Sequence, residues 1–257
     1  MPGARPLSAG LGDLRPEVLS SLERAALDWA GGSVQRLEDA FDEAFGALPC
    51  DDDVLGSDVP PEVVPLVSSG LDGPHFGFLV MAPEIDRIDA PVVSFGPGRP
   101  VRPFAASTRA AFARLAELEA EHNDELDDRL VDDLAAALEL PAASAPPEAF
   151  VASIPVGYRW RRGRDGIGVL AAAAAFGPTV IPDQPGLSLA EIDQWASRLL
   201  YDGFPAAACA VVRDAFTVGH GQPATWNRLA RTWAASYEAL NRPGLADQVR
   251  RRTARFG

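Results

Sequence analysis

Apolar residues in the first 50 positions recur every three or four residues, which is the spacing of one helix face. The first run predicts a helix that begins at Pro16 and ends at Gly31-Gly32. Ser33 suits the cap of a second helix, whose acidic residues face water. The two apolar faces consist of Val18, Leu22, Ala26 and Trp29, and of Leu37, Ala40, Phe41, Ala44, Phe45 and Leu48.

The pattern then changes to short β-branched and aromatic runs separated by proline and glycine. These runs predict three strands, at Val63–Val67, Phe76–Met81 and Val92–Phe95. Two further helices follow, one after Pro103–Thr108 and an acidic one over Asn123–Glu139. Two helices, a small sheet and two more helices predict an α+β fold.

A proline-rich stretch, Leu140–Ala149, follows this half of the chain. Its three prolines lie among small residues and cannot sustain a helix, which predicts a domain junction. We therefore expect an acidic α+β domain at residues 1–140, a connecting segment at 141–187 and an all-α domain of helical hairpins at 188–257.

The connecting segment allows two interpretations. Tyr158 and Trp160 alternate with arginines, and Arg164-Asp165-Gly166 could turn the chain, which predicts a β-hairpin. Equally, Gly166–Phe176 could form a buried alanine-rich helix.

From Ser188 onward the pattern is helical. Ser188 and Glu191 form a capping-box pattern, and Pro205, Pro223 and Pro243 each suit the first residue of a further helix. A shift of 38 residues superimposes Trp195 on Trp233, Pro205 on Pro243, Ala208 on Ala246 and Val211 on Val249. This internal repeat predicts two αα-hairpins.

Three segments of the first half carry a family resemblance. VPPEVVPLVSSGLDGPHFGFLV (Val59–Val80) is followed by PVVSF and by VRPFAASTRAAFARL. They resemble the SUKH superfamily of bacterial toxin-immunity proteins and cell-wall regulators at the Gly70–Gly73 turn, the Phe76-Gly77-Phe78 strand and Phe112–Leu115. Leu71 and Asp72 stand where that family has a double-glycine turn. The resemblance implies a non-catalytic domain that holds a partner, often a basic toxin domain, on an acidic surface and in a groove beside the sheet.

The C-terminal hairpins resemble tetratricopeptide-type repeats, which implies a binding scaffold. Their period of 38 residues exceeds the roughly 34 usual for that repeat, and the extra length lies in Thr217–Gln222. Two hairpins are fewer than the roughly three that a free solenoid needs, so we expect them to dock on the rest of the chain. An ordinary helical subdomain is the alternative.

Charge is divided unevenly between the halves. Residues 1–140 hold 27 acidic residues and 10 arginines, a formal −17, whereas residues 141–257 hold 9 and 13, a formal +4. The acidic half would attract a basic partner and repel nucleic acid. We therefore expect the basic patch to contact acidic groups of the same protein rather than nucleic acid. That patch consists of Arg159, Arg161, Arg162 and Arg164.

Composition also bears on location. The two cysteines, Cys50 and Cys209, form neither a disulfide framework nor a metal-type spacing. No apolar run approaches the roughly 18 residues that cross a bilayer, and the first residues lack the apolar region of a secretory signal. We expect a cytoplasmic protein that has no membrane contact and no cofactor.

Acidic residues and histidine are the candidate site residues. His75 with Asp72 could act as acid and base, and three consecutive aspartates could bind a hard cation. However, an aspartate before a glycine is typical of a plain turn, and alternation along the strand predicts that His75 faces water. We therefore expect these residues to contact a partner, and none to be catalytic or metal-binding. They are Asp51, Asp52, Asp53, Asp72 and His75.

Asp128 and Asp132 are four residues apart on a predicted helix, near His122, and could share a metal ion. The leucine stripe of that helix instead favours these acids as its solvated face. No nucleophile elbow, phosphate loop or His-Glu-x-x-His motif is present.

The sequence thus favours a non-enzymatic protein, an immunity protein or adaptor, that holds a basic protein partner. Two alternatives stay open. One is a metal-dependent enzyme of unfamiliar type that uses acidic residues and His75, and the other is a structural subunit of a larger assembly.

Overall fold

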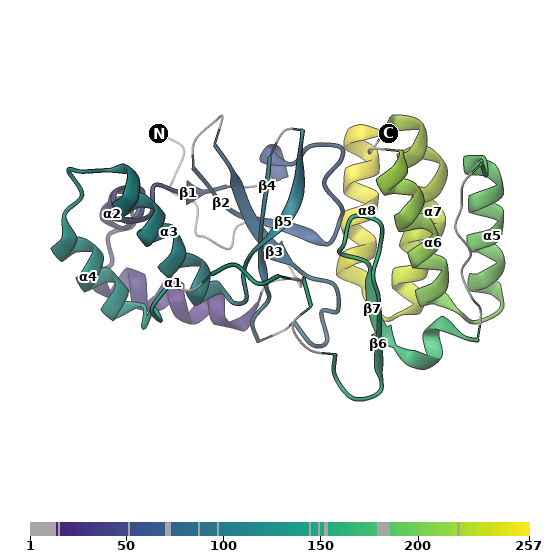
Figure 1. Ribbon diagram of the computed structural model, residues 1–257, viewed down its shortest axis with the longest axis horizontal. Coiled ribbons are helices and arrows are strands. Elements are labelled where there is room, and N and C mark those ends of the chain that lie inside the picture. Colours follow the sequence, from purple (N-terminus) through teal and green to yellow (C-terminus); the bar gives the residue numbers. More distant parts are fainter. Residues whose placement is uncertain are drawn as a thin grey trace. The chain divides into compact units, whose positions relative to one another are not determined.

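The computed structural model describes residue 14 and residues 16–50, 52–69, 73–86, 88–96, 98–143, 145–148, 150–151, 154–178, 186–219 and 222–257. The chain divides into two compact units (Figure 1). The first comprises Met1–Leu55, Val63–Val80 and Glu84–Glu148, and the second comprises Gly56–Glu62, Met81–Pro83 and Ala149–Gly257. The predicted α+β fold class is confirmed, since the described residues combine helices with an antiparallel sheet.

Four helices gather beside the sheet in the first unit (Figure 1). The side chains of Ser33 and Ser107 accept hydrogen bonds from the backbone N–H groups three residues onward, so each caps the helix that follows. Phe41 and Phe45 meet Phe112 at ring distances of 5.5 and 5.2 Å, which joins the second helix to the third. The helices are α1 (Glu17–Trp29), α2 (Val34–Phe45), α3 (Thr108–His122) and α4 (Asp128–Ala137), and a 3-10 turn, η2, covers Asp52–Val54.

The sheet of the first unit is an antiparallel meander whose strands follow one another in chain order. The sequence predicted its three inner strands and missed the two at the edges. Both edges are blunted, because β1 has only two residues and β5 carries Pro100 and Pro103. The strands are β1 (Leu48–Pro49), β2 (Val63–Ser68), β3 (His75–Leu79), β4 (Val92–Gly96) and β5 (Arg99–Ala105).

The central strand β3 corrects the expected orientation of His75. The prediction that His75 faces water is wrong, since this residue is only 4% exposed. Phe78, on the same strand, is 0% exposed. All five residues of β3 are buried, so the strand has no wet side and alternation along it carries no information. Gly77 packs closely against the neighbouring strand β2, because a Cβ atom at this position would lie only 2.6 Å from the Val64 carbonyl oxygen.

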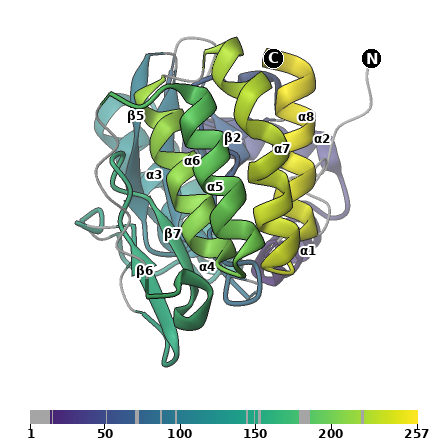
Figure 2. The same cartoon turned by 90° about the vertical axis from the view of Figure 1, so that its right-hand side faces the viewer.

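The second unit contains the two predicted helical hairpins, with α5, α6, α7 and α8 side by side (Figures 1 and 2). The capping box at Ser188 is present, and Pro205, Pro223 and Pro243 begin the next three helices as predicted. A shift of 38 residues carries the bounds of α6 onto those of α8, in agreement with the predicted repeat. The helices are α5 (Leu189–Tyr201), α6 (Pro205–Val218), α7 (Pro223–Ala239) and α8 (Pro243–Phe256).

The segment before α5 forms the predicted β-hairpin rather than an alanine-rich α-helix. Its strands β6 (Tyr158–Arg161) and β7 (Val169–Ala172) pair antiparallel, and only Ala173–Phe176 turn helically, as the 3-10 helix η3. Both β7 and η3 pack on α6, so the segment before α5 covers part of this helix. The eleven residues of α6 from Ala206 to Phe216 are all buried.

Truncation of Phe78 tests the packing of the central strand. We expect Phe78→Ala to lower the free energy of unfolding by about 3–5 kcal/mol, because it leaves a cavity under a well-packed sheet. Ile88→Ala is the matched control, since Ile88 is 71% exposed and its truncation should change stability by less than about 0.5 kcal/mol. Urea unfolding followed by circular dichroism measures both, and equal losses would contradict this assignment of the core.

Candidate functional site

The structure places the predicted partner-binding residues in different environments. Asp51 and Asp72 lie outside the described residues, and Asp52 begins η2 without a described side chain. Asp53 is exposed in η2. His75 is buried in β3, where its contacts are with Ser68 and Phe95, so it is not available to a partner at the surface.

Ser68 and His75 form a cross-strand pair between β2 and β3. The Ser68 Oγ and His75 Nδ1 atoms lie 2.8 Å apart, and the imidazole ring lies 5.6 Å from the ring of Phe95. Burial lowers the pKa of His75 below its ordinary value of 6.5, which favours the neutral ring. A serine beside a histidine is a nucleophile–base arrangement, but this imidazole is packed inside the sheet, where it stabilises the strand pairing.

Exposed carboxylates gather where α2 ends and where α3 turns into α4. Both α3 and α4 pack against α2, and a side chain at Gly46, the C-cap of α2, would touch the carboxylate of Glu119. The last turns of α2 and α3 both carry acids, although a helix C-terminus favours cations. We call this set the acidic end, and it consists of Asp42, Glu43, Glu121, Asp124, Glu125 and Asp128.

The acidic helix α4 has the orientation predicted for it. Asp128 and Asp132 are exposed whereas Leu134 and Leu138 are buried, so the acids form the solvated face. His122 is exposed, and its Nδ1 atom lies 2.7 Å from the Leu118 carbonyl oxygen. Among the residues that the structure describes, no group of three or more His, Cys, Asp and Glu side chains could hold a metal ion.

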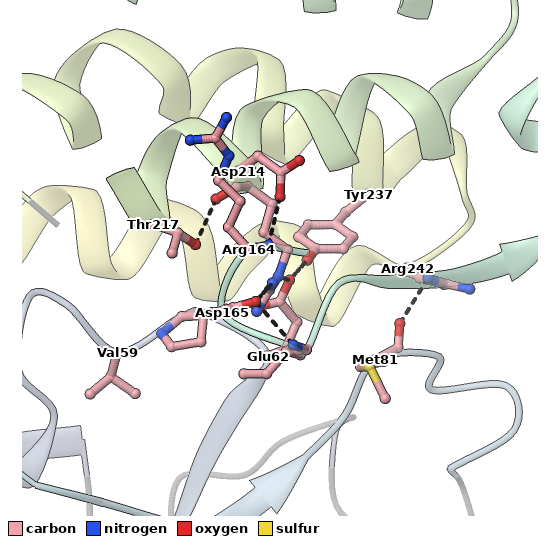
Figure 3. Close-up of polar contacts among 12 residues, drawn as sticks. Val59, Glu62, Met81, Arg164, Asp165, Asp214, Thr217, Tyr237 and Arg242 are labelled. Carbon is pink, nitrogen blue, oxygen red and sulfur yellow. Dashed lines mark hydrogen bonds and ion pairs between the residues drawn. The ribbon is translucent and has the colours of Figure 1, made fainter. Parts of the chain in front are cut away.

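The second unit contains a buried ionic cluster that sequence reasoning missed (Figure 3). Arg213 donates from Nε to Glu62 Oε1 at 2.9 Å and from Nη1 to Asp165 Oδ1 at 2.8 Å. The Tyr237 hydroxyl donates to the same Glu62 oxygen. We call Glu62, Asp165, Arg213, Asp214 and Tyr237 the charged cluster, and they come from the 56–62 segment, the β6–β7 loop, α6 and α7.

Burial and ion pairing shift the titration of the charged cluster. Burial would lower the pKa of Arg213, but its two carboxylate partners outweigh this and raise the pKa above the ordinary value, so its charge is fixed. Burial would raise the pKa of Asp165, but Arg213 outweighs this and lowers it. Burial raises the pKa of Tyr237, and it raises that of Cys209 to about 12, so the thiol is an unreactive group at neutral pH.

Two further buried arginines of the second unit donate hydrogen bonds to backbone carbonyl groups. Arg252 donates from Nη1 to the carbonyl oxygens of Val59 and Pro60 at 2.7 and 2.6 Å. Arg242 donates to the Met81 carbonyl oxygen at 2.8 Å (Figure 3). These bonds satisfy carbonyl groups that would otherwise be buried without a partner.

The basic patch of the β6–β7 hairpin contacts an acidic side chain of its own protein at Arg161, as predicted, whereas Arg162 and Arg164 are exposed. Arg161 pairs with Asp214 at 3.5 Å, and the guanidinium of Arg159 lies 5.5 Å from the ring centre of Phe176. The backbone N–H groups of Arg164 and Ile167 donate to Asp214 and Asp165. These amides of the glycine-rich loop are therefore occupied by carboxylates and do not form a phosphate cradle.

A weak sequence signal marked the charged cluster. Arg213-Asp214 is the charged pair inside the apolar run of α6, and Glu62 precedes the apolar run of β2. A charge within an apolar run predicts a buried ion pair, but the partner lies up to 151 positions away.

Comparisons with known proteins do not assign the chain to a family. No protein-family model matches the chain, and no curated protein matches it. Of the helices in the described part of the chain, none has the length and apolar character that a membrane crossing requires.

Stability should depend on pH through His75. Since the folded pKa lies below 6.5, the unfolded chain binds a proton that the folded chain does not. The contribution of this residue is therefore constant above pH 6.5 and falls as the pH drops below it, by at most about 1.4 kcal/mol per pH unit. Urea unfolding at several pH values should show a smaller slope for His75→Gln, while the exposed, non-titratable control Ile88→Ala keeps the wild-type slope.

Removal of the buried guanidinium should be costly. Arg213→Met leaves the carboxylates of Glu62 and Asp165 without their cation, and we expect a loss of about 3–5 kcal/mol in the free energy of unfolding. The control Arg250→Met, in a surface pair with Asp247, should leave the unfolding midpoint nearly unchanged. A small effect of Arg213→Met would show that the cluster contributes little to the fold.

Proposed function

We propose that the chain is a non-catalytic binding protein, an immunity protein or adaptor, that holds a basic protein partner on the acidic end of its first unit. The observation that carries this proposal is the gathering of exposed carboxylates at the ends of α2 and α3 and the start of α4. The positions of Asp42, Glu43 and Glu121 favour a role in recognition over one in stability, because acids in a last helical turn oppose the helix dipole.

The environment of these carboxylates supports the same proposal. Within the described residues, no ion pair joins Asp42, Glu43, Asp124 or Asp128 to a cation of the chain, in contrast to the carboxylates of the charged cluster. An unpaired set of like charges raises the association rate of an oppositely charged partner. The resemblance to SUKH immunity proteins, which hold basic toxin domains, points to the same class of partner.

Neutralisation of the acidic end tests the proposal. The variant Asp42→Asn, Glu43→Gln, Asp124→Asn, Asp128→Asn removes four charges, and a control variant neutralises Asp202, Glu238 and Asp247 of the second unit. In affinity capture from a native cell extract, we expect wild type and control to retain a basic protein at low salt. We expect the acidic-end variant to retain about tenfold less, and high salt to release the partner from all three.

Two results would contradict the proposal. One is capture of no basic protein at low salt. The other is a captured protein that the acidic-end variant holds as well as wild type, which would place the binding surface elsewhere.

A further inference from the structure

The loop that joins β6 to β7, residues 162–168, closes over the guanidinium of Arg213. Asp165 of this loop accepts a hydrogen bond from Arg213 Nη1 at 2.8 Å, and a side chain at Gly163 would lie 3.1 Å from the same nitrogen. Arg213 is 1% exposed. The loop is therefore part of what separates this buried charge from water.

The first five residues of the loop are attached mainly by polar contacts, although Gly166 packs against the ring of Phe150 and the buried Ile167 follows. Their sequence is Arg-Gly-Arg-Asp-Gly, so they bury no apolar side chain. Asp165 holds Arg213, while Asp214 of α6 accepts from the Arg164 backbone N–H at 3.1 Å and pairs with Arg161. A segment that has few apolar contacts opens locally at a lower cost than a helix in the core.

Two glycines in the second half of the loop provide the backbone freedom that such an opening needs. Gly166 and Gly168 have φ values of +85° and +81°, which disfavour other residues. Gly168 also lies so close to the Arg161 carbonyl oxygen that a side chain would meet it at 2.0 Å.

The closed arrangement leaves polar atoms under the loop without partners. Glu62 Oε2 and Arg213 Nη2 are buried, and neither has a hydrogen-bond partner among the described residues. Buried polar groups without partners are unfavourable, so access of water to them would offset part of the cost of opening.

We propose that residues 162–166 form a lid that opens and closes over the charged cluster while the second unit stays folded and the buried Ile167 stays in place, and that Asp165 and Asp214 together are its latch. The two carboxylates belong to one latch because they join two successive residues of the loop to two successive residues of α6. Asp165 binds Arg213, and Asp214 binds the backbone of Arg164. Opening exposes Arg213 and Glu62 to solvent. The lid is independent of the binding proposed for the acidic end.

Amide hydrogen exchange in the full chain tests the lid. The backbone N–H groups of Arg164 and Ile167 are bonded to Asp214 and Asp165 respectively, so each amide reports one half of the latch. In wild type, we expect both amides to exchange at a rate that is insensitive to low urea, whereas the amide of Val212 in α6 exchanges faster as urea is added.

Crossed substitutions separate a lid from two independent contacts. We expect Asp165→Ala to speed exchange about tenfold or more at Arg164, and Asp214→Ala to do the same at Ile167, because loss of either contact frees residues 162–166 together. Asp202→Ala, which removes an exposed carboxylate bonded to Arg198, should change neither amide. Effects confined to the amide that lost its own acceptor would overturn the proposal. The proposal would also be overturned if, in wild type, the exchange rates at Arg164 and Ile167 rose with urea as steeply as the rate at Val212. This second measurement uses the wild-type protein alone and does not require the variants to fold.

Discussion

The buried guanidinium of Arg213 is the constraint on which the second unit depends. A charge taken out of water is tolerated only when partners surround it, and removal of one partner leaves the rest uncompensated. Two carboxylates meet this need, and the chain supplies them from distant positions, Glu62 before β2 and Asp165 in the β6–β7 loop. Tyr237 adds α7 through the same Glu62 oxygen. One charge therefore determines which segments assemble around α6.

The buried arginines also change the meaning of the charge division. The second half of the chain is formally +4, but Arg213, Arg242 and Arg252 are each at most 3% exposed. Their charges satisfy internal carboxylates and carbonyl groups and are not displayed to solvent. Many carboxylates of the first half, in contrast, lie on the solvated faces of helices. The formal +4 of the second half therefore overstates the positive charge that this half displays to solvent.

Local sequence patterns predicted most helices and inner strands. The burial of individual side chains and the charged cluster depend on non-local contacts. Proline and serine signals placed the starts of six helices because helix ends are decided by a few adjacent residues. The edge strand β5 was missed because two prolines in seven residues resemble a loop, although an edge strand tolerates them. The orientation of His75 was wrong because alternation presumes one wet face, and β3 is buried throughout. The charged cluster could not be predicted, since nothing local links Glu62 to Arg213.

Ion pairs inside a protein are seldom the most stable solution. Apolar residues of similar volume often stabilise a core more than a buried ion pair does, so retention of Arg213, Glu62 and Asp165 calls for a reason other than stability. Specific pairing is one such reason, because an unpaired Arg213 penalises every packing in which the 56–62 segment or the β6–β7 loop is displaced. The loop differs from the segment in one respect. Glu62 is followed by the apolar run of β2, whereas Asp165 lies among glycines and arginines, so electrostatics is the main restraint on the first part of the loop. The same charge can thus fix one of its partners permanently and hold the other reversibly.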